Sequence, residues 1–270
     1  MATSNPAFKN TPAFSAGATK GIQLSQNLSA GQLDDLYGRP SATSVDTDRM
    51  TYEDTIVKTV ISFGFVLVGA AVGWFIPLLM IPAAIAGFVL ALVNIFKKKP
   101  SAPLVLSYAA VQGVFVGGLT MFFESQPEYS GIAVQAVLAT FTVVGVTLAL
   151  FASGKIRASA KATKIFLIAM VGYAAFSLIN FGMMIFGATD QPFGMRSMEI
   201  FGIPLGVILG VFVILLGAYS LVLDFDGVQQ GVRNGAPRAY AWKAAFGIVL
   251  TVIWLYMEIL RLLAILRGSN

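Results

Sequence analysis

Four ionisable residues near the C-terminal end of the chain are candidates for chemistry because they adjoin or interrupt long apolar segments. Asp224 and Asp226 follow the apolar segment 200–223, and Glu258 lies three residues before Arg261 in the last apolar segment. A charge inside a bilayer costs about 2.5–3.5 kcal/mol even on insertion scales, so such residues are rare and usually functional. If Glu258 meets either aspartate, the two carboxylates cannot both ionise cheaply and would titrate as a unit. Such a pair predicts a pH sensor, and its oxygens suit hard cations such as calcium.

The same residues also have a purely structural interpretation. Glu258 and Arg261 can share one helix face and neutralise each other, while Asp224 and Asp226 end the preceding helix at the membrane surface. If that helix begins near residue 200, Asp224 lies about 36 Å along it, whereas Glu258 lies about 22 Å into a helix that begins near residue 243. The carboxylates then meet only if the last helix enters the membrane later or its neighbour is tilted. The sequence leaves both interpretations open.

The elements that must position these residues are membrane helices. Of the 270 residues, 57% are hydrophobic and only 11% are charged, whereas soluble domains carry about 25% charged residues. A spanning helix needs about 20 apolar residues, and Pro77 and Pro82 divide the first long apolar segment into two helices. The sequence predicts an all-α integral membrane protein with seven transmembrane helices at 56–76, 80–96, 103–123, 131–153, 165–187, 200–223 and 243–266.

Composition also excludes several classes of function. The chain has no His and no Cys, which excludes a disulfide framework, a thiolate nucleophile, a His-containing triad and an imidazole metal site. We therefore expect neither an enzyme nor a bound cofactor, and the sequence assigns no metal ligands. The net charge of +5 comes from short basic clusters between apolar segments, so it indicates no nucleic-acid partner.

The basic clusters predict how the chain is oriented in the membrane. Three connections are rich in Lys and Arg, whereas the opposite connections contain mainly acidic residues and a single basic one, Arg196. The positive-inside rule places the basic connections and the N-terminus in the cytoplasm and the C-terminus outside. The basic residues are Lys97, Lys98, Lys99, Lys155, Arg157, Lys161, Lys164, Arg233, Arg238 and Lys243.

Residues 1–50 differ from the membrane domain, 51–270, because they are rich in Ser, Thr, Ala, Gly and Asn. This composition is typical of a disordered cytoplasmic arm. A near-repeat, Asn-Pro-Ala-Phe at 5–8 and Thr-Pro-Ala-Phe at 11–14, is either a docking motif for membrane-protein partners or part of a tail without a role.

Small and polar residues inside the spans indicate helix packing. Stripes of glycine let helices approach closely, and isolated polar side chains form hydrogen bonds between helices. The glycines are Gly69, Gly73, Gly113, Gly117, Gly202, Gly206 and Gly210, and the polar residues are Gln112, Gln135, Tyr173, Ser177 and Asn180.

The last two predicted helices resemble the Bax inhibitor-1 family. The resemblance is carried by Ser-Leu-Val-Leu-Asp-Phe-Asp at 220–226 and Trp-Leu-Tyr-Met-Glu-Ile-Leu-Arg-Leu-Leu at 254–263, within a seven-helix layout over about 50–267. It implies a central seventh helix surrounded by the other six. It further implies a pH-sensitive calcium leak channel, with calcium as the permeant ion, in a bacterial inner membrane. Glu258 would be the helix-seven acid, and either Asp224 or Asp226 its helix-six partner.

The sequence departs from the family pattern in details that concern gating. The helix-seven acid is Glu rather than the commoner Asp, and Arg261 would tune it. Some members have a basic latch late in the second helix, and the nearest residue here is Lys97, in the following loop. The loop between the two acids is about ten residues longer than in simple members, with Gly227, Gly231, Gly235 and Pro237 expected to make it irregular.

A second hypothesis belongs to a different class of function. The chain would be a non-conducting regulatory protein of the stress response, which binds other membrane proteins through its N-terminal arm and the helix bundle.

Overall fold

The computed structural model describes residues 48–268. In this range, seven helices are long and apolar enough to cross a membrane, which confirms the predicted fold class. Short 3-10 turns, η2 (Pro77–Leu79), η3 (Pro127–Tyr129) and η4 (Gly194–Ser197), and one antiparallel strand pair, β1 (Glu199–Ile200) and β2 (Ile203–Pro204), occur in the connections. The helices are α3 (Tyr52–Phe75), α4 (Met80–Phe96), α5 (Ala102–Glu124), α6 (Ile132–Ala152), α7 (Ala160–Ile185), α8 (Leu205–Arg233) and α9 (Tyr240–Gly268).

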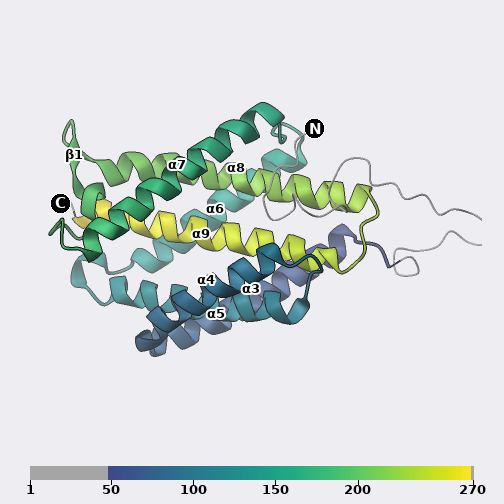
Figure 1. Ribbon diagram of the computed structural model, residues 1–270, viewed down its shortest axis with the longest axis horizontal. Coiled ribbons are helices and arrows are strands. Elements are labelled where there is room, and N and C mark those ends of the chain that lie inside the picture. Colours follow the sequence, from purple (N-terminus) through teal and green to yellow (C-terminus); the bar gives the residue numbers. More distant parts are fainter. Residues whose placement is uncertain (1–47, 269–270) are drawn as a thin grey trace, which may run out of the picture.

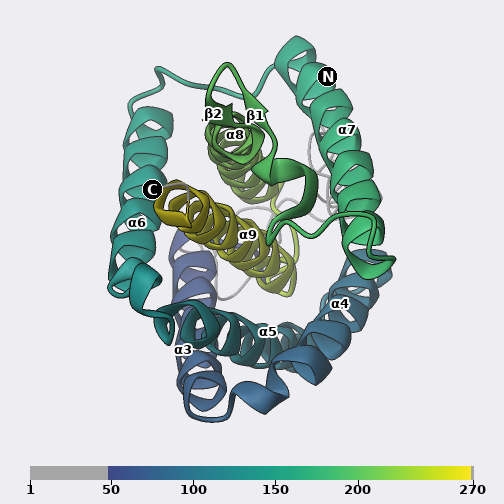
Figure 2. The same ribbon diagram turned by 90° about the vertical axis from the view of Figure 1, so that its left-hand side faces the viewer.

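The last helix, α9, lies at the centre of the bundle and the other six surround it (Figure 2). Its 29 residues include 16 that are buried, whereas α4 has only three buried residues among 17. Outer helices present apolar side chains to the surroundings, as a lipid-facing surface requires. The central position of α9 places Glu258 among protein side chains rather than against lipid.

Local sequence signals explain most helix boundaries. Thr51 caps α3 by accepting a hydrogen bond from the backbone N–H of Asp54 at 3.1 Å, a common N-terminal arrangement. The expected turn between the first two spans is confirmed, because α3 ends at Phe75 and η2 begins at Pro77, where the proline lacks the N–H that a helix interior needs.

The sixth predicted span is wrong at both ends. It was expected at 200–223, but α8 extends from Leu205 to Arg233. Asp224 and Asp226 therefore lie inside a continuous helix, and the expected irregular connection is helical as far as Arg233. Gly227 and Gly231 are buried in this helix, so here glycine permits close packing instead of ending the helix.

Helices α3 and α5 cross at close range through glycines, as the sequence predicts. A Cβ atom at Gly117 would lie only 2.0 Å from the carbonyl oxygen of Ala70, and one at Gly69 would lie 2.1 Å from that of Ala110. Gly206 and Gly210 also pack against α9, but they face the side chains of Ile265 and Leu262 and not backbone carbonyls of that helix. Gly202 precedes α8 with a φ of +76° and has open space around it. The stripe on the sixth span is thus shorter than expected.

The start of the described chain is fastened to the α8–α9 connection. Arg49 pairs with Pro237 in an isolated β-bridge, Met50 N donates to Ala236 O at 2.7 Å, and the Met50 side chain is buried. This attachment lies at the same end of the bundle as the α4–α5 connection (Figure 1). The predicted disorder of the arm and its near-repeat fall in residues 1–47, outside the described residues.

Candidate functional site

Asp224 is completely buried between α8 and α9. Its side chain is 0% exposed, and Oδ2 accepts a hydrogen bond of 2.6 Å from the hydroxyl of Thr251. The Thr251 hydroxyl lies 3.4 Å from that of Ser220, one turn before Asp224 on α8. Helices α8 and α9 are thus joined by a carboxylate and two hydroxyl groups.

A cavity of about 210 Å³ adjoins this group. Two of its lining residues, Ser220 and Thr251, carry the hydroxyls that lead to Asp224, and none of the lining residues is charged. The lining comes from four helices: Ile95 of α4, Phe166, Leu167 and Met170 of α7, Ser220 and Leu223 of α8, and Phe246, Gly247, Leu250 and Thr251 of α9. The cavity gives the buried hydroxyls room for a small ligand or water.

Asp226 occupies a different environment from Asp224. It is half-buried, and its Oδ2 accepts a hydrogen bond of 2.5 Å from the side-chain amide of Gln230, four residues later on α8. This is a local contact within one helix turn. Of the two aspartates that sequence analysis leaves open, Asp224 is the one in the core between α8 and α9.

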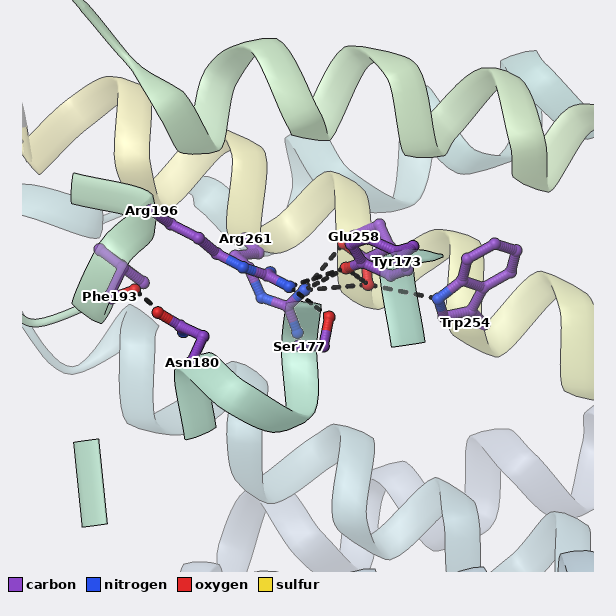
Figure 3. A network of polar contacts seen from close by, with 8 residues as sticks. All are labelled: Tyr173, Ser177, Asn180, Phe193, Arg196, Trp254, Glu258 and Arg261. Atoms are coloured by element: carbon purple, nitrogen blue, oxygen red, sulfur yellow. Dashed lines mark hydrogen bonds and ion pairs between the residues drawn. The ribbon is translucent and has the colours of Figure 1, made fainter. Parts of the chain in front are cut away.

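Glu258 belongs to a second polar network, which is shown in Figure 3. Its Oε2 lies 2.8 Å from Nη1 of Arg261, and its Oε1 accepts hydrogen bonds from the Tyr173 hydroxyl at 2.7 Å and from the Trp254 indole at 3.2 Å. The carboxylate is 5% exposed. Its charge is compensated by a guanidinium group, as a buried charge requires.

The predicted contact between Glu258 and Asp224 or Asp226 is not formed in the structure. Glu258 forms its hydrogen bonds with Tyr173, Trp254 and Arg261, and not with Asp224 or Asp226. The residue of α9 that meets Asp224 is Thr251, and seven residues of helix place Glu258 about 10 Å further along the axis. The i, i+3 pairing of Glu258 with Arg261 is the structural alternative from the sequence, whereas the roles of these residues in gating stay predictions.

Helix α7 contributes one polar face to the second network. Tyr173, Ser177 and Asn180 lie on the same side of the helix because they are spaced by four and three residues. Arg196 of η4 donates to the Tyr173 hydroxyl at 3.0 Å and to the Ser177 hydroxyl at 2.8 Å. Asn180 holds the loop around η4 by donating to Phe193 O at 3.2 Å and accepting from Met195 N at 2.7 Å.

Lys97, the nearest candidate for a basic latch, lies at the end of α4 and is exposed. It takes part in the core through its backbone carbonyl, which lies 3.5 Å from the ammonium group of the buried Lys243. That ammonium also contacts the carbonyl of Ile95 at 3.4 Å. A basic residue of α9 thus contacts the last carbonyls of α4, whereas Lys97 itself is exposed.

In residues 48–268, no group of three or more His, Cys, Asp or Glu side chains is placed to hold a metal ion. The oxygen donors in the core are single carboxylates with neighbouring hydroxyls. This arrangement suits transient contact with a hard cation better than tight binding, which takes six to eight oxygen ligands for calcium.

Sequence reasoning did not give Thr251 or Arg196 a role. A threonine in an apolar helix carries little signal, because its hydroxyl commonly bonds to a carbonyl of its own helix. Arg196 did carry a signal, as the only basic residue in the acidic connections. Tyr173, Ser177 and Asn180 were interpreted only as packing groups, although their spacing of four and three residues is that of one helix face.

Comparison with known proteins agrees with this architecture. A family model described as Bax inhibitor 1 like matches residues 5–268. A search of curated proteins gives no match. The match covers nearly the whole chain and agrees with both the resemblance of the last two spans and the seven-helix bundle. The chain therefore belongs to the Bax inhibitor 1-like family of membrane proteins.

Proposed function

We propose that this protein is a passive, pH-sensitive cation leak channel, with calcium as the expected permeant ion. The observation that carries the proposal is the Asp224 carboxylate, which is 0% exposed inside a bundle of membrane helices. An ionisable group inside a membrane protein is costly and is by default a functional site. Family membership and the adjoining cavity support the same function.

The chemistry around Asp224 suits passage of a small hard cation. The carboxylate and the hydroxyls of Thr251 and Ser220 form a chain of oxygen atoms beside the cavity of about 210 Å³. Calcium prefers oxygen ligands and exchanges them readily in flexible sites. A short row of such oxygens offers a permeating ion weak ligands, which conduction requires.

The bond between Thr251 and Asp224 provides the pH dependence. An ionised carboxylate accepts a stronger hydrogen bond than a neutral carboxyl group does. Proton binding to Asp224 therefore weakens the link between α8 and α9, and we expect the leak to increase as the pH falls.

Three other buried charged side chains of the bundle have partners of their own. The ammonium of Lys58 on α3 binds Asp54 at 2.5 Å and the carbonyl of Arg238 at 3.0 Å. Lys243 of α9 contacts the carbonyls at the end of α4. Glu258 is compensated by Arg261, so Asp224 is the acid whose protonation we expect to change the leak.

Calcium flux into dye-loaded liposomes tests this function. The wild-type leak should rise as the pH falls, whereas Asp224→Asn should leak at one rate at every pH tested. Asp226→Asn is the matched control, because it makes the same chemical change on the same helix at a half-buried site, and it should keep the wild-type pH profile. Absence of wild-type flux at every pH, or an unchanged pH profile in Asp224→Asn, would overturn the proposal.

We further propose that the basic end of the bundle lies in the cytoplasm and that the membrane is a bacterial inner membrane. Because the chain has no Cys, single Cys variants report topology without background. In intact spheroplasts, an impermeant maleimide should label Gln191→Cys, in the α7–α8 connection, whereas it should label Lys98→Cys, in the α4–α5 connection, only after permeabilisation. The reverse pattern would invert the orientation.

Partner binding through the N-terminal arm remains a second candidate function. The observation that favours it is the attachment of Arg49 and Met50 to the α8–α9 connection, since a partner held by the preceding residues would act next to α8. Deleting residues 1–47 separates the candidates. Loss of a cellular phenotype with unchanged calcium flux supports partner binding, whereas loss of flux with an intact fold contradicts it.

A further inference from the structure

Arg196 places a buried guanidinium group at the end of the bundle opposite the basic connections. The residue is 6% exposed, and its guanidinium lies 5.3 Å from the ring centre of Tyr173 and 5.6 Å from that of Phe176. Its hydrogen-bond acceptors, the hydroxyls of Tyr173 and Ser177, are uncharged. The ion pairs within residues 48–268 involve Asp54 and Glu258 with other basic partners, and none includes Arg196.

The cluster around Arg196 therefore carries a surplus positive charge. Arg261 and Arg196 both donate to the Tyr173 hydroxyl, each at 3.0 Å, so two guanidinium groups lie next to each other (Figure 3). Glu258 is the one carboxylate among the residues of this network, and both of its oxygens contact Arg261. Two positive charges and one negative charge leave one positive charge uncompensated in surroundings where like charges repel strongly.

One donor of this cluster is also unsatisfied. Within the described residues, no acceptor contacts the buried Nε of Arg196. A buried N–H group without an acceptor is rare, because it loses its hydrogen bond to water and gains none in return. The donor and the surplus charge belong to the same side chain, and both are satisfied by the same kind of ligand, a small anion.

A cavity of about 10 Å³ lies at this cluster. Arg196, Arg261, Tyr173 and Glu258 provide its polar wall, and Gly206 and Gly210 are among the residues that provide the other side. Space of this size holds about one water-sized sphere. Polyatomic anions such as sulfate exceed it by far, and a monatomic ion, although larger than water, is the smallest kind of anion that could take this place.

We propose that this cavity binds one monovalent, monatomic anion of the halide class, held by Arg196 together with Arg261. A halide accepts N–H groups from any direction, so it can satisfy Arg196 Nε and balance the surplus charge at once. A water molecule would satisfy the N–H group and leave the charge. Glu258 does not exclude the anion, because its carboxylate is already paired with Arg261. The bound anion fastens η4, the turn that carries Arg196, to α7 and α9.

Thermal unfolding of the full chain in detergent tests this site. Sodium chloride or bromide should raise the Tm by about 2–4 °C relative to sodium gluconate at equal ionic strength, because a ligand that binds only the folded state stabilises it. Arg196→Gln should lose this shift. Arg157→Gln is the matched control at an exposed arginine and should keep it. Glu258→Gln, which removes the one negative charge, should increase the shift.

Bromide anomalous diffraction gives an independent readout that does not depend on variants. A bromide peak within hydrogen-bonding distance of Arg196 Nε supports the site even if Arg196→Gln fails to fold. An ordered water at that position without a bromide peak, or equal Tm values in gluconate and halide, would show that water alone occupies the cavity and would overturn the proposal. Because these readouts need no flux, their failure leaves the proposed leak channel untouched.

Discussion

Thr251 of α9 donates a 2.6 Å hydrogen bond to Asp224 of α8, and this contact joins the two helices where a pair of carboxylates was expected. Unlike a carboxylate, a hydroxyl group carries no charge, and it can donate a hydrogen bond at every pH relevant here. Thr251 therefore places no second negative charge next to Asp224. In the proposed channel, the response of Asp224 to protons involves its hydrogen bond with Thr251.

Replacing Thr251 should therefore weaken the bundle and open the leak. Valine has nearly the shape of threonine but no hydroxyl, so Thr251→Val should lower the free energy of unfolding by about 1.5–3 kcal/mol, the contribution typical of a hydrogen bond to a charged group. It should also raise calcium flux at neutral pH. Thr251→Ser keeps the hydroxyl and should restore most of the stability and the low flux. Denaturant titration in mixed micelles measures the stability, and equal values for the Val and Ser variants would contradict this role.

The helices could be predicted because a bilayer leaves the chain few choices. About 20 apolar residues are needed to span it, so six of the seven spans were placed within a few residues of their observed bounds. The exception is α8, whose predicted end at residue 223 followed the end of the apolar segment without charged residues. A buried aspartate can continue a helix when another helix supplies its donor, and the Thr251 hydroxyl does so here.

The site was predictable only where its contacts are local. The pairing of Glu258 with Arg261 follows from their i, i+3 spacing. The contact of Thr251 with Asp224 does not, since other buried threonines of the bundle, such as Thr55 and Thr140, bond to carbonyls four residues earlier. The position of Arg196 depends on the path of a loop, which hydrophobic periodicity does not describe.

The Glu258–Arg261 pair should show an asymmetric response to mutation. Removing one partner of a buried ion pair costs about 3–5 kcal/mol, because the other charge is left uncompensated. Glu258→Gln leaves two neighbouring guanidinium groups without a carboxylate, whereas Arg261→Gln leaves Glu258 beside Arg196. We therefore expect Glu258→Gln to be the more destabilising single variant.

A double-mutant cycle with free energies of unfolding measures this pair. The double variant should be less destabilised than the sum of the single variants, with a coupling of about 0.5–3 kcal/mol. Additive effects, or a larger loss in Arg261→Gln than in Glu258→Gln, would contradict the charge distribution around Arg196.

Asn180 should control the loop that carries Arg196. Its amide bonds to Phe193 O and Met195 N, and it is 6% exposed, so Asn180→Ala leaves both loop groups without these partners. We expect hydrogen exchange at the Met195 amide to become about 5–30-fold faster, as the loss of one or two kcal/mol implies. Asn180→Asp keeps the acceptor for Met195 N, loses the donor to Phe193 O and should give an intermediate rate.

The matched control for this loop is Gln191→Ala, which truncates an exposed side chain in the same connection and should leave exchange at Met195 unchanged. Exchange in α9 should also stay slow in Asn180→Ala, because the central helix is packed by residues that the substitution does not touch. A comparable acceleration throughout α9 would mean that Asn180 supports the whole bundle, whereas a selective effect at residues 193–196 would show that the loop opens as a separate unit.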